Sequence, residues 1–338
     1  MQSAYGFSMV FSMRKYKWGI LGPGNIARSF AKGLAVASNA IAYAVGSRDL
    51  SRAQAFAKEY GYEKAYGSYA ELAADPDVEI IYVATPHPQH EEAAILCLNA
   101  KKAVVCEKPF APNTRQASRM IDCARANGVF LMEGMWTRFF PTICKTRELI
   151  DIGAIGKVLH VNVDFGFRAN VDPKGRLFDP NAAGGSLLDV GVYNASFCSM
   201  IYKRPPDKVQ SSLSIGATGV DESSNIIFDY GCGQSAALFS AIRVPTAQDA
   251  AIYGEDGYIK LPAYWHGDTV ILNNKSGAHE YKLPPEPTGF QYEAAEVMSC
   301  LDAGLAESLI MPLDETLEII KVLDEIRRVN HLRYPFED

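Results

Sequence analysis

Lys108 is a positively charged side chain in an apolar setting. It lies between Glu107 and Pro109, directly after the apolar run at 103–106. A cation at the end of a buried strand is costly unless a partner compensates it. We therefore expect Lys108 to contact a bound cofactor and a substrate hydroxyl. An ion pair with Glu107 is an equally simple explanation of Lys108 alone.

A second group with possible chemistry follows the glycine pair at 184–185. We expect a helix over 185–202, which places Asp189 and Tyr193 one turn apart on one face, while Gly191 allows a close backbone approach. A phenol beside an ammonium can exchange a proton with a substrate hydroxyl, because the cation lowers the phenol pKa. Asp189 would then orient the substrate. The alternative is a helix whose Asp189 and Tyr193 bond only each other or solvent.

Alternating strands and helices must position Lys108. Apolar runs at 16–21, 40–45, 78–84, 102–106 and 129–132 predict strands. Between them, the patterns at 26–36, 50–60, 89–100 and 114–127 predict helices. Such alternation is typical of βαβ units, and so of a doubly wound parallel sheet of the Rossmann type.

A glycine-rich turn follows the first predicted strand and opens the first predicted helix. Gly22, Gly24, Asn25, Ile26 and Ala27 fit the GxGxxA form of the dinucleotide fingerprint. The first glycine permits a tight turn and the second lets the backbone approach a pyrophosphate. The helix N-terminus then faces that anion. We expect a dinucleotide to bind here.

The end of the second strand carries Ser47 and Arg48, where a ribose-binding carboxylate is expected for NAD. A hydroxyl and a guanidinium suit a 2′-phosphate. We therefore expect NADP in preference to NAD. The alternative is that Arg48 is solvated and Asp49 binds the ribose.

A third loop follows the strand at 78–84 and holds Thr85, His87 and His90, with prolines at 86 and 88 that fix its backbone. We expect this loop to lie beside the nicotinamide. For the two histidines a structural role, in packing or in capping the next helix, is as well supported as contact with the cofactor. No third ligand lies near them in sequence, so we expect no metal site.

The chain from about residue 150 has a different pattern. Residues 158–167 alternate between apolar and polar, and further strands are expected at 209–215, 225–230, 234–242 and 259–261, with helices at 290–305 and 313–332. This grouping predicts an α+β domain with a mostly antiparallel, open sheet. We expect an NAD(P)-binding domain at 13–135 and a substrate-binding and dimerisation domain at 136–338, whose last helices could pack back on the first. Residues 168–179 are a candidate rim or lid over the site.

Composition narrows the classes of function. A net charge of -6 over 338 residues offers no basic surface for nucleic acid or membranes, and no window is apolar enough to span a bilayer. Residues 1–12 lack the pattern of a signal peptide. Seven cysteines without a CxxC pair predict free thiols, which suits a cytoplasmic protein acting on small molecules.

The Glu107-Lys108-Pro109 tripeptide, the segment from Gly184 to Tyr193 and the run at 133–141 together resemble the Gfo/Idh/MocA oxidoreductases. The run at 133–141 is most similar to the branch of dimeric dihydrodiol dehydrogenases and NADP-dependent D-xylose dehydrogenases. Many members have histidine at the position of Tyr193.

The resemblance implies a role for individual residues. Glu107 and Lys108 would contact the cofactor, Tyr193 would transfer the proton and Asp189 would bind substrate. Trp136 and Arg138 would border the nicotinamide pocket. It also implies a homodimer formed through the open sheet face, with a higher oligomer possible.

Five aromatic residues could line a pocket for a substrate ring, although such residues are more often ordinary core. Of these we expect Trp136 and Phe165 to contact substrate; the others are Phe139, Phe140 and Phe167.

Our main hypothesis is an NADP-dependent oxidoreductase acting on a secondary hydroxyl or carbonyl of a cyclic polyol, a sugar or a trans-dihydrodiol. A related alternative is the NADPH-dependent reduction of a keto- or anhydro-sugar. An alternative of another class is a redox sensor that binds NADP(H) without turnover.

Overall fold

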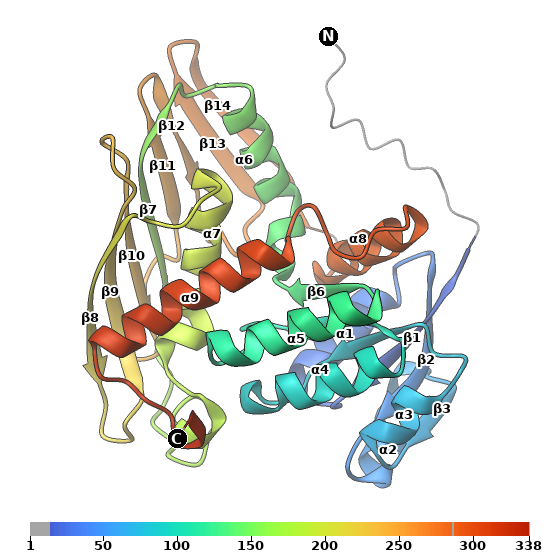
Figure 1. Cartoon of the computed structure of the whole chain (residues 1–338). Helices are drawn as coiled ribbons and strands as arrows, with labels where there is room; N and C mark the ends of the chain where they lie inside the picture. Colours follow the sequence, from blue (N-terminus) through green and yellow to red (C-terminus); the bar gives the residue numbers. More distant parts are fainter. Residues whose placement is uncertain (1–13, 286, 338) are drawn as a thin grey trace.

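The computed structural model describes residues 14–285 and 287–337 and contains two β-sheets, each with its own helices (Figure 1). The expected N-terminal extension at 1–12 lies outside the described residues. The fold class predicted from the sequence is confirmed: a Rossmann domain precedes a domain with a mostly antiparallel sheet.

The first sheet has six parallel strands in the order β3-β2-β1-β4-β5-β6. Its strands are β1 (Tyr16–Leu21), β2 (Ala40–Gly46), β3 (Lys64–Tyr66), β4 (Ile80–Val83), β5 (Ala103–Glu107) and β6 (Leu131–Gly134). Its helices are α1 (Asn25–Leu34), α2 (Leu50–Tyr60), α3 (Tyr69–Ala74), α4 (His90–Asn99) and α5 (Thr114–Asn127), with a 3₁₀ turn, η1, at His87–Gln89. The strand order reverses between β1 and β4, where such sheets bind ligands at the carboxyl ends.

Local signals explain these helices well. The side chains of Asp49, Ser68 and Asn113 cap α2, α3 and α5 by accepting from backbone N–H groups in the first turn. Gly61 and Gly128 end α2 and α5 in the left-handed conformation. The cap at Asp49 follows Ser47 and Arg48 directly, so it fixes the end of the loop that carries them.

The second sheet has eight strands in the order β14-β13-β12-β11-β7-β10-β9-β8. They are β7 (Val158–Gly166), β8 (Lys208–Ile215), β9 (Asp221–Asp229), β10 (Ser235–Ala241), β11 (Ala250–Gly254), β12 (Gly257–Leu261), β13 (Thr269–Asn274) and β14 (Gly277–Lys282). Only the β7–β10 pair is parallel. Two helices, α6 (Pro141–Asp151) and α7 (Val192–Tyr202), pack on one face, as Figure 1 shows. The opposite face is not covered by any described element.

Several short elements were not predicted. They are β3, α3, α6, β11, β13 and β14, together with the short helices η2 (Trp136–Phe139), η3 (Pro180–Ala182) and η5 (Pro335–Glu337). Most are too short for a hydrophobic period to show in the sequence. The helix expected over 185–202 also differs, because it begins as a π-helical turn, η4, at Leu187–Gly191 before α7.

The last two helices, α8 (Phe290–Asp302) and α9 (Leu313–Val329), pack back on the first domain. A Cβ on Gly33 of α1 would lie 2.8 Å from Cβ of Phe290, so a glycine is needed where α1 meets α8. Helix α9 lies across α5 and α7, and Arg327 fixes its end by bonding Glu337 and the carbonyl of Pro112. Both domains therefore share these helices.

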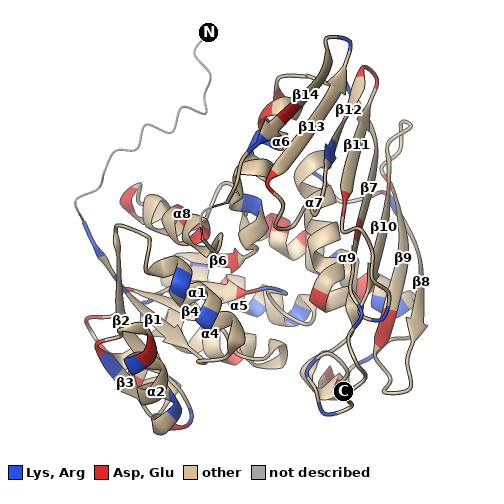
Figure 2. Cartoon of the chain, turned by 180° about the vertical axis from the view of Figure 1, so that it is seen from behind, with Lys and Arg blue, Asp and Glu red and all other residues tan. Residues whose placement is uncertain are grey.

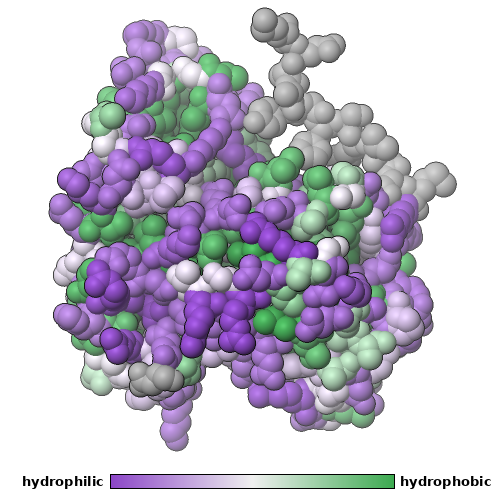
Figure 3. Space-filling view, viewed as in Figure 1, coloured by the Kyte–Doolittle hydropathy of each residue, from purple (hydrophilic) through white to green (hydrophobic). Residues whose placement is uncertain are grey.

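The surface has no single dominant charge. Acidic and basic residues are interspersed over both domains in Figure 2, and Figure 3 shows hydrophilic side chains over much of one face with smaller hydrophobic areas between them. None of the described helices is both long and apolar enough to cross a membrane. All seven cysteines are free, and no group of three metal-ligating side chains occurs among the described residues.

Candidate active site

The glycine-rich turn lies at the mouth of a cleft of about 810 Å³ at the carboxyl ends of the parallel strands. Gly22 has a φ of +93°, and a Cβ there would lie 3.0 Å from the carbonyl oxygen of Ala84, so this turn requires glycine. Gly24 caps α1 without any side-chain bond, and a Cβ on it would point into open space. The first backbone N–H groups of α1 are thus accessible to an anion.

This cleft is lined by most of the residues that were predicted to bind the cofactor. They are Gly22, Gly24, Asn25, Ile26, Ser47, Arg48, Thr85, His87, His90, Glu107 and Lys108, together with Asp189 from the second domain. Two arginines that the sequence reasoning missed, Arg52 and Arg176, also line it. The cleft is therefore formed by the ends of four parallel strands and by two residues of the second domain, Arg176 and Asp189.

The outer end of the cleft holds Ser47, Arg48 and Arg52. Asp49, the alternative ligand for a ribose, is engaged locally: its Oδ1 accepts hydrogen bonds from the N–H (2.8 Å) and hydroxyl (2.7 Å) of Ser51. Those hydrogen bonds lower the pKa of Asp49. Arg52 follows Arg48 by four residues at the start of α2, and this i, i+4 spacing was the signal available in the sequence.

The loop after β4 contains one unpartnered polar atom and one fixed histidine. The hydroxyl of Thr85 is buried in the cleft wall without a hydrogen-bond partner among the described residues. Behind it, His90 is fully buried, with Nε2 2.9 Å from the carbonyl of Thr85 and Nδ1 3.0 Å from that of Pro109. His90 thus ties together the loops after β4 and β5.

These features fit a dinucleotide. A glycine turn that leaves space beside a helix N-terminus suits a pyrophosphate, and an unpartnered buried hydroxyl suits a polar group of the ligand. The residues that would hold the dinucleotide are the cleft-lining ones from β1 to β5.

Lys108 lies at the inner end of the cleft, between Asp189 and Tyr193. Its ammonium donates to the carbonyl of Asp189 (2.9 Å), lies 3.9 Å from Oδ1 of the same residue, and sits 4.7 Å from the centre of the Tyr193 ring. Burial disfavours its charge, but Tyr193, Asp189 and Glu107 outweigh burial and raise the pKa of Lys108. Lys108 is therefore a cation at neutral pH.

Glu107 does not form the side-chain ion pair with Lys108 that we considered. Its carboxylate accepts from the hydroxyl of Tyr82 and from the backbone N–H of Lys108 (3.0 Å). Burial raises the pKa of Glu107 although Lys108 opposes this. The carboxylate fixes the loop, and the ammonium of Lys108 points to the second domain.

Tyr193 is buried behind Lys108 and is not part of the cleft wall. Its hydroxyl oxygen accepts a hydrogen bond from Nε1 of Trp136 (2.8 Å). As expected, the charge of Lys108 acts to lower the pKa of Tyr193, but it does not decide the balance. Burial raises the pKa more than the charge of Lys108 lowers it. The phenol is thus neutral and keeps a proton to donate.

Asp189 shares its carboxylate between two cations. Oδ1 is 2.7 Å from Nη1 of Arg176, and Lys108 is its second positive neighbour. Burial disfavours the carboxylate, but both cations together lower the pKa of Asp189. Nη1 of Arg176 also lies 3.4 Å from Nε2 of His87, whose Nδ1 is 3.3 Å from the carbonyl of Ala183.

Two stacked aromatic pairs flank Tyr193. Trp136 stacks on Phe290 with ring centroids 4.3 Å apart, and Phe165 stacks on Trp265 at 4.8 Å. Phe165 also lies 5.4 Å from the ring of Tyr193. Neither Trp136 nor Phe165 lines the dinucleotide cleft, and the sequence reasoning missed Phe290 and Trp265 because they follow in distant segments.

Arg138 lies outside the cleft and differs from its expected role. It is buried, with Nη2 2.6 Å from a carboxylate oxygen of Glu315 and 2.8 Å from the carbonyl of Ser196. These contacts join η2 to α7 and α9, so its position is that of a structural ion pair. Phe139 and Phe140 are likewise buried in the core.

Comparisons with known proteins agree with this architecture. Residues 16–135 match the family model described as an oxidoreductase family with an NAD-binding Rossmann fold, and residues 143–260 match the GFO/IDH/MocA C-terminal domain. The chain is 37% identical to trans-1,2-dihydrobenzene-1,2-diol dehydrogenase of Mus musculus and 36% identical to that of Homo sapiens. Each alignment covers 94% of this chain and 98% of the relative.

Solved structures resemble the whole chain. Aldose-aldose oxidoreductase from Caulobacter crescentus, solved with glycerol, has a TM-score of 0.87 and 25% identity over 94% of this chain and 98% of that one. A levoglucosan dehydrogenase solved with NADH and levoglucosan has a TM-score of 0.86 at 18% identity, again over 94% and 98%, which supports the fold alone.

The fold and cleft define an NAD(P)-dependent oxidoreductase. The chain belongs to the GFO/IDH/MocA oxidoreductase family, as its resemblance predicted.

Proposed function

We propose that the protein is an NADP-dependent dehydrogenase acting on a secondary hydroxyl of a cyclic diol, polyol or sugar. The observation that carries the proposal is the position of Lys108, a partly buried cation between Asp189 and Tyr193 at the inner end of the dinucleotide cleft. A nucleotide-binding protein without chemistry has no need for a cation, a phenol and a carboxylate there.

Each residue has a separate task. A bound nicotinamide supplies the acceptor or donor of the hydride. Lys108 stabilises negative charge that develops on the substrate oxygen, and Tyr193 exchanges the proton of that oxygen. Asp189 accepts from a substrate hydroxyl and so orients the ring.

The preference for NADP rests on Arg48 and Arg52. Two guanidinium groups and the hydroxyl of Ser47 line the end of the cleft next to β2, where the 2′-phosphate of NADP would lie. Asp49 is committed to capping α2, which weakens the case for a ribose carboxylate and hence for NAD.

A cyclic substrate agrees with the aromatic pairs beside Tyr193, because flat apolar faces favour ring-shaped ligands. The relatives named trans-1,2-dihydrobenzene-1,2-diol dehydrogenase point to the same class. The reverse reaction, reduction of a keto- or anhydro-sugar, is a second candidate. It is favoured by the raised pKa of Tyr193, since a neutral phenol can donate a proton to a carbonyl oxygen.

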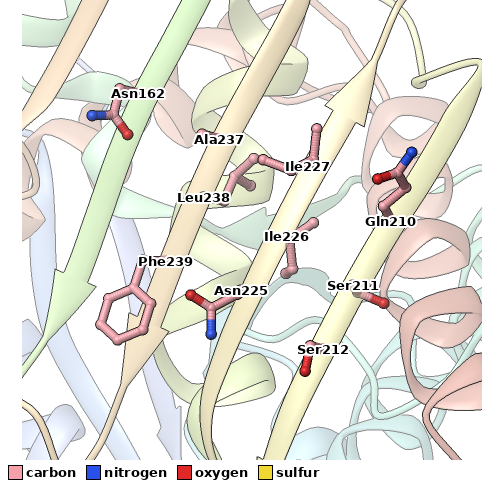
Figure 4. Close-up of a pocket in the computed structure, with 10 residues that line it drawn as sticks. All are labelled: Asn162, Gln210, Ser211, Ser212, Asn225, Ile226, Ile227, Ala237, Leu238 and Phe239. Carbon is pink, nitrogen blue, oxygen red and sulfur yellow. The ribbon is translucent and has the colours of Figure 1, made fainter.

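We also propose a homodimer formed through the uncovered face of the second sheet. Ile227, Tyr253 and Tyr258 are exposed on this face. Figure 4 shows a shallow hollow across β7, β10, β9 and β8, lined by polar groups and by Ile227 and Phe239. An uncovered face of this kind suits pairing with a second copy.

The variants Lys108→Met and Tyr193→Phe test the catalytic assignment. Each should lower kcat/KM for a diol or sugar by about a hundredfold or more, because proton transfer and charge stabilisation are lost. The affinity for NADP, followed by protein fluorescence, should change little. The measurement is NADPH formation at 340 nm.

Two control variants remove the same chemical groups, a phenol hydroxyl and a lysine ammonium, at residues that do not line the cleft. Tyr202→Phe alters a tyrosine at the far end of α7 that bonds the carbonyl of Ser235, and Lys101→Met removes an exposed lysine before β5. Both should keep wild-type turnover. Full activity in Lys108→Met and Tyr193→Phe would refute the assignment.

A further inference from the structure

Arg176 is the one cation in the cleft wall contributed by residues 168–179, the segment between β7 and η3 that we call the rim segment. Its guanidinium lies beside Asp189 and His87, which also line the cleft. The side chain is 46% exposed, whereas Asp189, to which it is bound at 2.7 Å, is 9% exposed. Arg176 therefore forms the solvent-side boundary of the site.

The rim segment has a defined conformation that holds Arg176 in this place. A Cβ on Gly184 would lie 2.7 Å from the carbonyl oxygens of both Arg176 and Leu177, so the chain after the segment passes directly against its backbone. Gly185 donates from its N–H to the carbonyl of Leu177 (2.9 Å), and Phe178 is 1% exposed in the core. Such anchoring distinguishes Arg176 from a solvated surface arginine.

The second contact of Arg176 fixes its orientation. His87 is fully buried, and burial followed by the charge of Arg176 keeps its pKa well below the ordinary value. The neutral ring can donate from Nδ1 to the carbonyl of Ala183 and accept at Nε2 from Arg176. One guanidinium nitrogen is thereby held between a carboxylate and an imidazole, and Nε and Nη2 have no bond to any described residue.

The positively and negatively charged side chains around Asp189 are not equal in number. Two cations, Lys108 and Arg176, face the single carboxylate of Asp189, while the carboxylate of Glu107 is bonded to Tyr82 and to backbone. A ligand with two adjacent oxygens matches this set: one oxygen beside Lys108, the next able to donate to Asp189 and accept from Arg176. A hydroxyl is the group that does both.

We propose that Arg176, acting with Asp189, is the specificity-determining residue that binds the hydroxyl next to the one being oxidised, so that the enzyme selects vicinal diols. The inference rests on the proposed function. It adds the residue that recognises the second hydroxyl.

The test compares two substrates that differ by that hydroxyl, trans-cyclohexane-1,2-diol and cyclohexanol, with NADP. Arg176→Met should lower the ratio of kcat/KM for the diol to that for cyclohexanol by about tenfold or more, the effect of losing one charged hydrogen bond. Arg176→Lys should lower the ratio less. If cyclohexanol is not oxidised by the wild type, competitive inhibition constants replace kcat/KM for both compounds.

Arg168→Met is the matched control, since Arg168 is exposed in the same segment and bonds only the carbonyl of Arg243. It should leave the ratio unchanged. An equal loss for both substrates in Arg176→Met, or an unchanged ratio in both Arg176 variants, would overturn the proposal. A wild-type enzyme that oxidises no cyclic diol, polyol or sugar would instead refute the proposed function.

Discussion

Lys108 is charged because Tyr193, Asp189 and Glu107 offset the effect of burial on its pKa. In the proposed reaction this cation lies where the substrate oxygen would gain negative charge. The Asp189 carboxylate depends on the same balance, since Lys108 and Arg176 both lower its pKa. At the level of single residues the site is a set of mutually dependent charges. The pKa values of Lys108 and Asp189 therefore depend on each other.

We predict that Arg48→Ala weakens NADP much more than NAD. Loss of a charged hydrogen bond to a 2′-phosphate should raise the dissociation constant of NADP by about 10- to 100-fold. Titration of protein fluorescence with each dinucleotide measures this. Lys58→Ala, which removes an exposed cation from the end of the same helix α2, is the control. Equal weakening of NADP and NAD would contradict the specificity argument.

Much of the cleft that we assign to the cofactor could be predicted from the sequence, because the glycine turn, Ser47 and Arg48 directly follow recognisable strands. The sequence did not allow Arg176 to be predicted, because Arg176 pairs with Asp189 only after the rim segment folds. Arg138 is the reverse case. Its place in a family-like run predicts contact with the cofactor, whereas in the structure its side chain is buried and bonded to Ser196 and Glu315.

At the level of elements, the π-helical turn η4 connects the second sheet to the catalytic candidates. Asp221 is buried on β9, and its Oδ2 accepts from the hydroxyl of Ser186 (2.6 Å) and the N–H of Leu187 (2.7 Å). A Cβ on Gly191 would lie 2.9 Å from the hydroxyl of Ser240, so the turn is pressed against β10. A strand side chain thus sets the start of the helix that carries Asp189.

We expect Asp221→Ala to destabilise the protein by about 1–3 kcal/mol, because two buried donors at Ser186 and Leu187 lose their acceptor. Asp221→Asn, which keeps an acceptor oxygen, should lose less. Urea unfolding followed by circular dichroism gives both free energies. A smaller loss for alanine than for asparagine would show that the cap is not what stabilises the turn.

The helix expected over residues 185–202 shows which features of an element apolar spacing cannot predict. Apolar spacing placed Asp189 and Tyr193 in one helix, and the structure keeps both residues near Lys108. The π turn itself depends on Asp221, which is distant in sequence, and on close packing against β10. Short strands such as β11 also depend on their neighbours, since pairing with β7 and β12 defines them.

For the whole molecule, buried carboxyl groups lie where the two domains meet. Glu133 is fully buried, accepts from Phe110 and Thr316, and has a pKa raised by burial to about 7. Glu293 of α8 is also fully buried, has no hydrogen-bond partner among the described residues, and has a pKa raised by burial and by Glu107. These groups hold protons that the unfolded chain releases.

We predict that Glu133→Gln makes stability less dependent on pH. The pKa of Glu133 is about 7 in the folded protein and about 4.3 in the unfolded chain. This difference stabilises the folded protein fully below pH 4, and the stabilisation is lost as the pH rises toward 7. The wild type should lose on the order of 2 kcal/mol relative to the variant between pH 5 and 8. His87 and His90, whose pKa values are lowered by burial, change the stability with pH in the opposite direction. The quantity to compare is therefore the difference in stability between the wild type and Glu133→Gln, measured by thermal unfolding at each pH. Parallel curves would contradict the prediction.

The proposed dimer predicts that Ile227→Lys yields monomers, because a charge on β9 would be buried between the paired sheets. Light scattering after gel filtration should give twice 37.0 kDa for the wild type and 37.0 kDa for the variant. Leu309→Lys, at an exposed apolar residue after α8, should stay dimeric. A wild-type monomer would refute the proposal.

The return of α8 onto α1 has a consequence for how the chain matures. During synthesis, residues 14–134 can form their six-stranded sheet long before Phe290 emerges, yet the surface of α1 around Gly33 stays bare until it does. The nucleotide cleft can therefore form early, whereas Trp136 gains its stacking partner Phe290 only near the end of translation. A nascent chain stalled before residue 290 should bind dinucleotide but expose apolar helix surface to chaperones.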